Sequence, residues 1–270
     1  MKKIFVPVFY ASLATCLALA AEDFPTAKKN LTPADLAELE GVAASGDARA
    51  MFVLGVTYAE GRGVPKDIPK AVAFFERAAA KGDALAQFNL GAMYANGIYF
   101  PKDEPKAIQW YLKAAAQGDA KAQFNLGLMY ESGSGVAQDD AKAAELFEKA
   151  ADRVHPDAQF KLGVMYASGR GVPKDEARAV EWYQKAAERG STSAQFNLGA
   201  MYANGIGTSK DNVRAYVWLN LSGIEDEEAK VARQDLEEQL TPEQKVEAQR
   251  LQARLADVIK REQQKQPQPR

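Results

Sequence analysis

The sequence has few of the residues on which catalytic and metal chemistry usually depends. Among its 270 residues there is one Cys and one His. One Cys cannot close a disulfide within the chain, and one His leaves few ways to build a His-rich metal site or a Ser/His/Asp triad. We therefore predict that the protein is not an enzyme and has no catalytic residues, no metal site and no cofactor.

The chain also has no large excess of charge of either sign. Lys and Arg number 34 against 36 Asp and Glu, which gives a net charge of -2. A surface that binds nucleic acid needs an excess of basic side chains gathered on one face, so we exclude nucleic acid as a partner. Hydrophobic residues make up 47% of the chain, which is enough for a sizeable core and argues against a disordered protein.

An apolar stretch near the N-terminus predicts export. A short basic start precedes an uncharged run over residues 4–21, the order typical of a secretory signal peptide. Ala18-Leu19-Ala20 offers the small-x-small pattern that signal peptidase accepts, so we predict a cleaved signal peptide over residues 1–20. The alternatives are an uncleaved membrane anchor, because 18 apolar residues can just span a bilayer, and lipidation of Cys16. Cleavage would give a periplasmic or secreted mature chain without cysteine or a membrane span.

The middle of the sequence repeats every 36 residues. A Leu-Gly pair recurs five times at this interval without insertion or deletion, and a Tyr, a Gly and an Asp follow each pair at the same spacing. A period of 20 to 50 residues is typical of a solenoid built from stacked units. The five pairs begin at Leu54, Leu90, Leu126, Leu162 and Leu198.

Each repeat predicts two antiparallel helices. In the second repeat Asp83 is placed to cap a first helix, whose apolar residues follow at four-residue spacing. Gly97 stands where a left-handed residue is needed after that helix, and Asp103 caps a second helix that ends near Gly118. Two such helices bury little apolar surface alone, so each pair must pack against its neighbours.

Capping helices are predicted on both sides of the repeats. Thr32-Pro33-Ala34-Asp35 is typical of a helix start, and so is Thr241-Pro242-Glu243-Gln244, which opens a helix ending near Glu262. The predicted organisation is a signal peptide at 1–20, an N-terminal segment and capping helix at 21–46, five repeats at 47–222, C-terminal capping helices at 223–262 and a disordered tail at 263–270.

The repeats resemble Sel1-like repeats, a 36-residue relative of the tetratricopeptide repeat. The resemblance rests on Phe88-Asn89-Leu90-Gly91-Ala92-Met93-Tyr94-Ala95-Asn96-Gly97 and on Gly169-Arg170-Gly171-Val172-Pro173-Lys174-Asp175, and it covers about Gly46 to Ser222. It implies an all-α fold, an α-solenoid wound as a right-handed superhelix of five helix-turn-helix repeats.

Two places depart from the Sel1-like pattern. Tyr99 and Phe100 replace the Gly-Val of the loop in the second repeat, and Val154-His155-Pro156 replaces the Gly-Asp linker after the third. Either could be a site of specificity or a tolerated change. We favour the tolerated change, because loops vary freely.

The resemblance also implies a kind of function. Exported bacterial members include regulators of membrane sensor kinases, factors in polysaccharide secretion, host-interaction proteins and immunity proteins. We therefore expect a non-enzymatic adaptor of the bacterial periplasm or cell envelope, whose partner is another protein such as an envelope sensor, a secretion component or a secreted effector. One alternative is an immunity protein that neutralises a type VI-secreted lipase effector. The other is an antibiotic-hydrolysing enzyme, disfavoured because such relatives carry paired cysteines in each repeat.

A partner-binding face is predicted on the first helices. On a helical wheel one Phe and several small residues lie opposite the core stripe. By analogy with tetratricopeptide repeats this face lines the concave side of the superhelix, where a neighbouring Asn could hydrogen-bond a peptide backbone. Alternatively, the rings pack between adjacent first helices and meet no partner. The candidate residues are Phe52, Phe88, Asn89, Phe124, Asn125, Phe160, Phe196 and Asn197.

Overall fold

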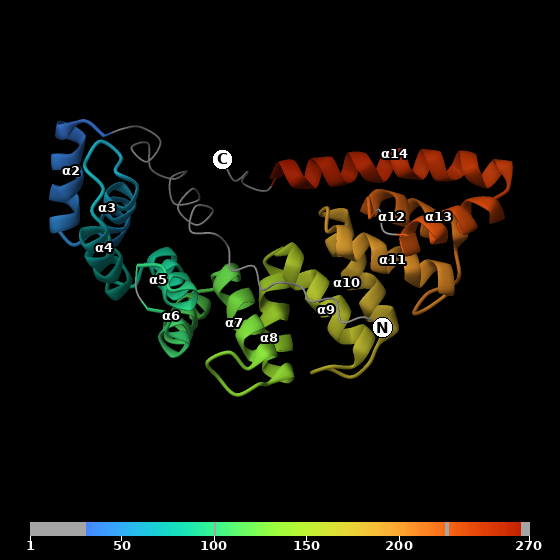
Figure 1. The fold of residues 1–270 in the computed structure, drawn as a ribbon, viewed down its shortest axis with the longest axis horizontal. Coiled ribbons are helices and arrows are strands. Elements are labelled where there is room, and N and C mark those ends of the chain that lie inside the picture. Colours follow the sequence, from blue (N-terminus) through green and yellow to red (C-terminus); the bar gives the residue numbers. More distant parts are fainter. Residues whose placement is uncertain (1–30, 100, 225–226, 266–270) are drawn as a thin grey trace. The chain divides into compact units, whose positions relative to one another are not determined.

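The computed structural model describes residues 31–99, 101–224 and 227–265, and the predicted signal peptide lies outside these ranges. Within them there are thirteen helices and no strand, so the chain is all-α, and its consecutive helix pairs form an α-solenoid (Figure 1). The helices are α2 (Pro33–Ala44), α3 (Ala48–Glu60), α4 (Ile68–Ala80), α5 (Ala84–Asn96), α6 (Glu104–Ala116), α7 (Ala120–Ser132), α8 (Asp140–Asp152), α9 (Pro156–Ser168), α10 (Glu176–Glu188), α11 (Thr192–Asn204), α12 (Asn212–Ser222), α13 (Glu227–Gln239) and α14 (Pro242–Lys265).

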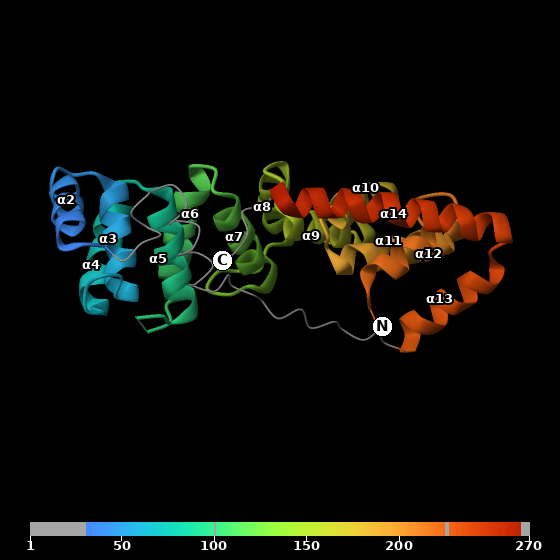
Figure 2. The same ribbon diagram turned by 90° about the horizontal axis from the view of Figure 1, so that it is seen from above.

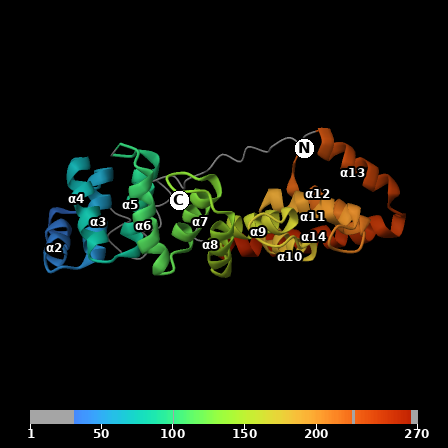
Figure 3. The ribbon, with the colours of Figure 1, turned by 90° about the horizontal axis from the view of Figure 1, so that it is seen from below.

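The helices form two compact units. The first unit extends to Gln138 and holds α2 to α7, and the second begins at Asp139 and holds α8 to α14. In the first unit α3 packs on α4 and α5 on α6, and α4 also packs on α5, which joins the two pairs (Figure 2). In the second unit α9 and α10 are joined to α11 and α12 in the same way (Figure 3).

The ends of the first helices follow from their capping residues. The Asp83 carboxylate accepts a hydrogen bond from the Ala86 N–H at the start of α5, and Gly97 ends that helix with a φ of 67°. Both predictions for this helix are confirmed. The same arrangement recurs along the chain, with side-chain caps at Asp47, Asp83, Asp119 and Ser191 and left-handed glycines at Gly61, Gly97, Gly133, Gly169 and Gly205.

The recurring Leu-Gly pair has two separate packing roles. Leu90 is fully buried, while its neighbour Gly91 lies under the ring of Tyr111 from the second helix of the same repeat. A Cβ on Gly91 would lie 2.6 Å from that ring, and one on Gly163 would lie 2.5 Å from the ring of Tyr183. The glycine therefore lets the two helices approach until a ring touches the backbone.

A later loop glycine joins neighbouring repeats. Gly171 and Gly207 have φ values of 73° and 67°, and a Cβ on either would overlap a backbone carbonyl of the preceding repeat, at Asp140 and at Glu176. Tyr99 occupies this position in the second repeat and adopts a φ of 65°. The loop is thus a tight contact between repeats as well as a connection.

The terminal helices start where the capping patterns predicted. Thr32 and Asp35 form a reciprocal capping box at the start of α2, and Thr241 and Gln244 exchange the same pair of bonds at the start of α14. In the second unit α14 lies along α12 and reaches α10 (Figures 1 and 2). None of the helices in the described ranges has the length and apolar content needed to cross a bilayer.

The end of α14 differs from the prediction. The helix runs to Lys265, three residues beyond the predicted end at Glu262 and into the tail predicted to be disordered. Gln and Lys are good helix formers, and Gln263 lies beside Gly190 in the loop after α10, which supports the last turn. The remainder of that tail, residues 266–270, lies outside the described part of the chain.

Candidate partner-binding face

In the first unit, three of the candidate phenylalanines lie on α3, α5 and α7. Phe52 is 1% exposed, Phe88 is 0% exposed and Phe124 is 9% exposed. The ring centroids of Phe52 and Phe75 are 5.4 Å apart, and those of Phe88 and Tyr111 are 5.8 Å apart. Each of these two rings therefore packs on an aromatic residue of the second helix in its own repeat.

In the second unit, the remaining two phenylalanines are more open. Phe160 on α9 and Phe196 on α11 are half-buried, although the Phe160 ring also packs on a second-helix aromatic, with its centroid 5.9 Å from that of Tyr183. Small or aliphatic residues on the same face of the two helices are half-buried as well: Val164 and Ala167 on α9, and Ala200 and Ala203 on α11.

Two of the three candidate asparagines contact the preceding repeat. The Asn125 amide donates to the Tyr111 hydroxyl over 3.3 Å, and Asn197 hydrogen-bonds the hydroxyl of Tyr183. In both cases the tyrosine stands fourteen residues earlier, on the second helix of the previous repeat. These amides link adjacent repeats, a role that sequence reasoning missed.

The other repeats show what happens without the tyrosine. Phe75 stands fourteen residues before Asn89, and there the Asn89 amide donates instead to the Leu85 carbonyl of its own helix, over 2.7 Å. The Asn89 Oδ1 atom is buried without a hydrogen-bond partner. In the fourth repeat Phe147 is followed by Lys161 in place of asparagine. The fourteen-residue spacing of tyrosine and asparagine, which recurs at Tyr111/Asn125 and Tyr183/Asn197, was the available sequence signal.

Burial affects the chemistry of one of these tyrosines. Burial raises the pKa of Tyr183 to about 12, and the hydrogen bond from Asn197 acts in the opposite direction. The hydroxyl therefore stays protonated at physiological pH and serves as a neutral hydrogen-bonding group rather than as an acid or a base.

A second regular feature combines tyrosine and cations. The Lys70 ammonium lies 3.9 Å from the Tyr58 ring centroid and donates to the Tyr58 hydroxyl, which raises the pKa of Lys70 above its ordinary value. Arg178 donates to the Tyr166 hydroxyl in the same way. A Lys or Arg follows the repeat tyrosine by twelve residues in all five repeats, so the spacing could have been found in the sequence.

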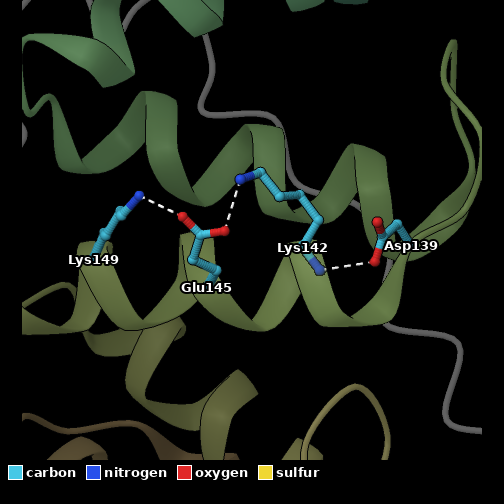
Figure 4. Close-up of polar contacts among 4 residues, drawn as sticks. All are labelled: Asp139, Lys142, Glu145 and Lys149. Carbon is cyan, nitrogen blue, oxygen red and sulfur yellow. Dashed lines mark hydrogen bonds and ion pairs between the residues drawn. The ribbon is translucent and has the colours of Figure 1, made fainter.

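The exposed side of α8 carries an ion-pair cluster (Figure 4). The Glu145 carboxylate lies between the ammonium groups of Lys142 and Lys149, at 2.6 Å from each. These two hydrogen bonds lower the pKa of Glu145 to about 2. Asp139 caps the helix by accepting from the Lys142 backbone N–H. The Glu145 carboxylate therefore stays ionised at physiological pH.

The two departures from the repeat pattern coincide with unusual backbone. Tyr99 and Val154 each have a φ of 65° where the other repeats have glycine, and both side chains are exposed. His155 is the N-cap residue of α9 but makes no side-chain capping bond. Val154 and His155 therefore lack the favourable backbone and cap that Gly-Asp provides in other linkers.

Within the described residues, no three His, Cys, Asp or Glu side chains come together in a group that could hold a metal ion. His155 lies in the linker between α8 and α9. The regular features of the molecule are therefore surfaces and contacts between repeats.

Comparison with known protein families identifies the repeats. The model of the Sel1 repeat matches five consecutive segments, residues 48–83, 84–119, 120–155, 156–191 and 192–223. The chain belongs to the Sel1 repeat family. Sel1 repeats typically mediate protein–protein interaction, and the family generally provides non-enzymatic scaffolds.

Solved structures of Sel1 repeat proteins are similar to this one. A Sel1 repeat protein from Oxalobacter formigenes is 34% identical, with a TM-score of 0.67 over 70% of this chain and 78% of that chain. A protective antigen with an SLR fold from uropathogenic Escherichia coli strains is 28% identical, with a TM-score of 0.54 over 96% of this chain and 65% of that one. None of the curated proteins compared with the chain matches it.

Proposed function

We propose that this Sel1 repeat protein is a non-enzymatic adaptor that is exported to the bacterial periplasm or cell envelope and binds another protein. Its partner binds on the face of the first helices that carries the repeated phenylalanine. The family's usual role supports the adaptor function, and the basic and apolar start of the sequence supports export.

The observation that carries the proposal is the half-buried apolar face in the second unit. The helices α9 and α11 contact each other, and their faces present Phe160, Val164, Phe196 and Ala200 as partly accessible apolar side chains. Aromatic side chains in a partly desolvated setting are common anchors in protein interfaces. Beside them, Asn197 and Lys161 are half-buried polar side chains.

The partner is found by affinity purification of the mature protein from its own cell envelope, and the site is then tested by mutation. Replacing Phe160 and Phe196 by Ala should weaken partner binding, measured by calorimetry, about tenfold or more. Leu112→Ala is the matched control, because Leu112 is an exposed apolar residue on a second helix, α6. Circular dichroism confirms that each variant is folded.

The identity of the partner decides among the narrower functions. A sensor kinase or a polysaccharide export component would make the protein an envelope regulator, whereas a secreted lipase would make it an immunity protein. Unchanged affinity of the double variant would show that the partner binds elsewhere. Antibiotic turnover without any protein partner would overturn the adaptor function.

A further inference from the structure

One leucine on the outer side of a second helix is unusually exposed. Leu112 on α6 is 45% exposed. Three residues lie within about 80° of arc on the same side of the helix: Ile108, which is buried, and Pro105 and Ala116, which are exposed. These four residues are the outer face of α6. The other second helices carry polar residues at the position of Leu112, namely Glu76, Glu148, Gln184 and Asn220.

Two lysines border one edge of this outer face. The Lys106 ammonium lies 3.1 Å from the Asp103 carboxylate at the helix start, and the Lys113 ammonium lies 3.9 Å from the Trp110 ring centroid. Gln109 stands between the two lysines, so the middle of this edge carries no negative charge.

The third repeat has an acid at the same place. On α8 the equivalents of the two lysines are Lys142 and Lys149, and Glu145 stands where α6 has Gln109. The Glu145 carboxylate pairs with both ammonium groups, at 2.6 Å from each (Figure 4). The helix α6 therefore has the positive edge of this cluster without its central acid.

The second unit shows how a helix covers the outer side of a second helix. On α12, Val213 and Val217 stand at the positions of Pro105 and Gln109, and they are 7% and 0% exposed. They belong to one apolar cluster with residues of α14, among them Leu251. Apolar residues on the outer side of α12 are thus buried by an amphipathic helix.

The covering helix also supplies an acid. Arg214 on α12 stands at the position of Lys106 on α6. Its pKa is raised above the ordinary value of arginine, first by the hydrogen bond to Tyr202 and further by the charge of Glu247 on α14. A helix packed on the outer side of a second helix therefore meets both its apolar residues and its flanking cation.

We propose that the outer face of α6 binds an amphipathic helix of a partner protein. The apolar side of that helix covers Ile108 and Leu112, and acidic side chains along its edge pair with Lys106 and Lys113. This goes beyond the proposed function, because it gives the adaptor a second docking surface. The surface lies on a second helix, so Leu112 remains a control for the partner that binds the first helices.

The probes are two synthetic peptides with the sequence of residues 242–262, which form most of α14. One peptide has the native sequence. The other carries Arg250→Glu, Arg254→Glu and Arg261→Glu, which place acids along one edge of its apolar stripe. Fluorescence anisotropy at low salt should show that the acidic peptide binds the purified protein about tenfold or more tightly than the native-sequence peptide. The difference should shrink at high salt, because exposed charges are then screened.

Variants of the protein locate the bound peptide. Leu112→Glu should weaken binding of the acidic peptide about tenfold or more, and it should fold, because α4 and α8 carry Glu at this position. Lys106→Gln together with Lys113→Gln should remove the preference for the acidic peptide. Val231→Glu is the matched control, since Val231 is a 55% exposed residue of α13, and it should not change the affinity. Circular dichroism checks that each variant is folded.

Three results would overturn the inference: no binding of either peptide, equal affinity of the two peptides for the parent protein, or unchanged affinity of the Leu112→Glu variant. A dimer that this variant dissociates in analytical ultracentrifugation would also overturn it, because a second copy of the chain would then cover the face. Replacing Phe160 and Phe196 by Ala should leave peptide binding unchanged. Failure of this inference is therefore distinguishable from failure of the proposed function.

Discussion

Restoring the usual Gly-Asp linker before α9 should stabilise the protein. Val154 adopts a φ of 65°, whereas the corresponding residues Gly82 and Gly190 have φ values of 97° and 89°. His155 occupies the N-cap without a side-chain bond, whereas Asp83 at the same place accepts from the helix backbone. The perturbation is Val154→Gly together with His155→Asp.

The structure sets the size of the expected gain. A left-handed residue with a Cβ costs about 1–2 kcal/mol, and the greater freedom of glycine in the unfolded chain offsets about 0.4–1 kcal/mol of that gain. The Val154 side chain is 50% exposed, so little burial is lost. A new Asp N-cap contributes about 1 kcal/mol. Together the two changes should raise the free energy of unfolding by about 1–2.5 kcal/mol, and the Tm by about 2–10 °C for a chain of this size.

Thermal unfolding followed by circular dichroism checks this, with each single variant measured beside the double variant. Gly82→Val is the matched control, because no heavy atom lies within 4 Å of a Cβ built there and only the backbone conformation opposes the change. It should lower the Tm. A double variant that melts at or below the parent, or a Gly82→Val variant with an unchanged Tm, would refute the reasoning.

Three further predictions concern the contacts between helices and the surface of α8. Gly91→Ala should lower the free energy of unfolding by about 1–3 kcal/mol, because the added Cβ would overlap the Tyr111 ring. Gly41→Ala is the control and should not lower it, because a Cβ at Gly41 meets no atom within 4 Å. Urea unfolding compares the two variants. Tyr111→Phe should cost about 1–3 kcal/mol in the same assay by leaving the buried Asn125 amide without its acceptor. The pKa of Glu145 is lowered to about 2. Its ion pairs therefore stabilise the protein fully at pH values above the ordinary pKa of a glutamate, and this stabilisation is lost as the pH falls through about 2. Glu145→Gln should therefore lower the Tm slightly at pH 7 in low salt and leave it unchanged below pH 2; an equal shift at both would contradict this.

Local pattern alone determined the architecture. The 36-residue period, the caps at Asp83 and Asp103 and the glycine at Gly97 predicted helix pairs in register, and the structure confirms those helix ends. These features are readable because a cap or a left-handed turn acts within a few residues of the chain. The repeat itself then implied that neighbouring pairs must pack together.

Contacts between distant residues were decided only by the tertiary structure. Gly91 is small because a ring twenty residues later lies on it, and Asn125 is placed by a tyrosine fourteen residues earlier. The clearest case is the stretch that α5 and α11 share, residues 86–98 and 194–206, in which Phe88 is buried and Phe196 is half-buried. Helical conformation follows from the sequence of a segment, but burial depends on what other parts of the chain lie over it, and a repeated sequence cannot specify that difference.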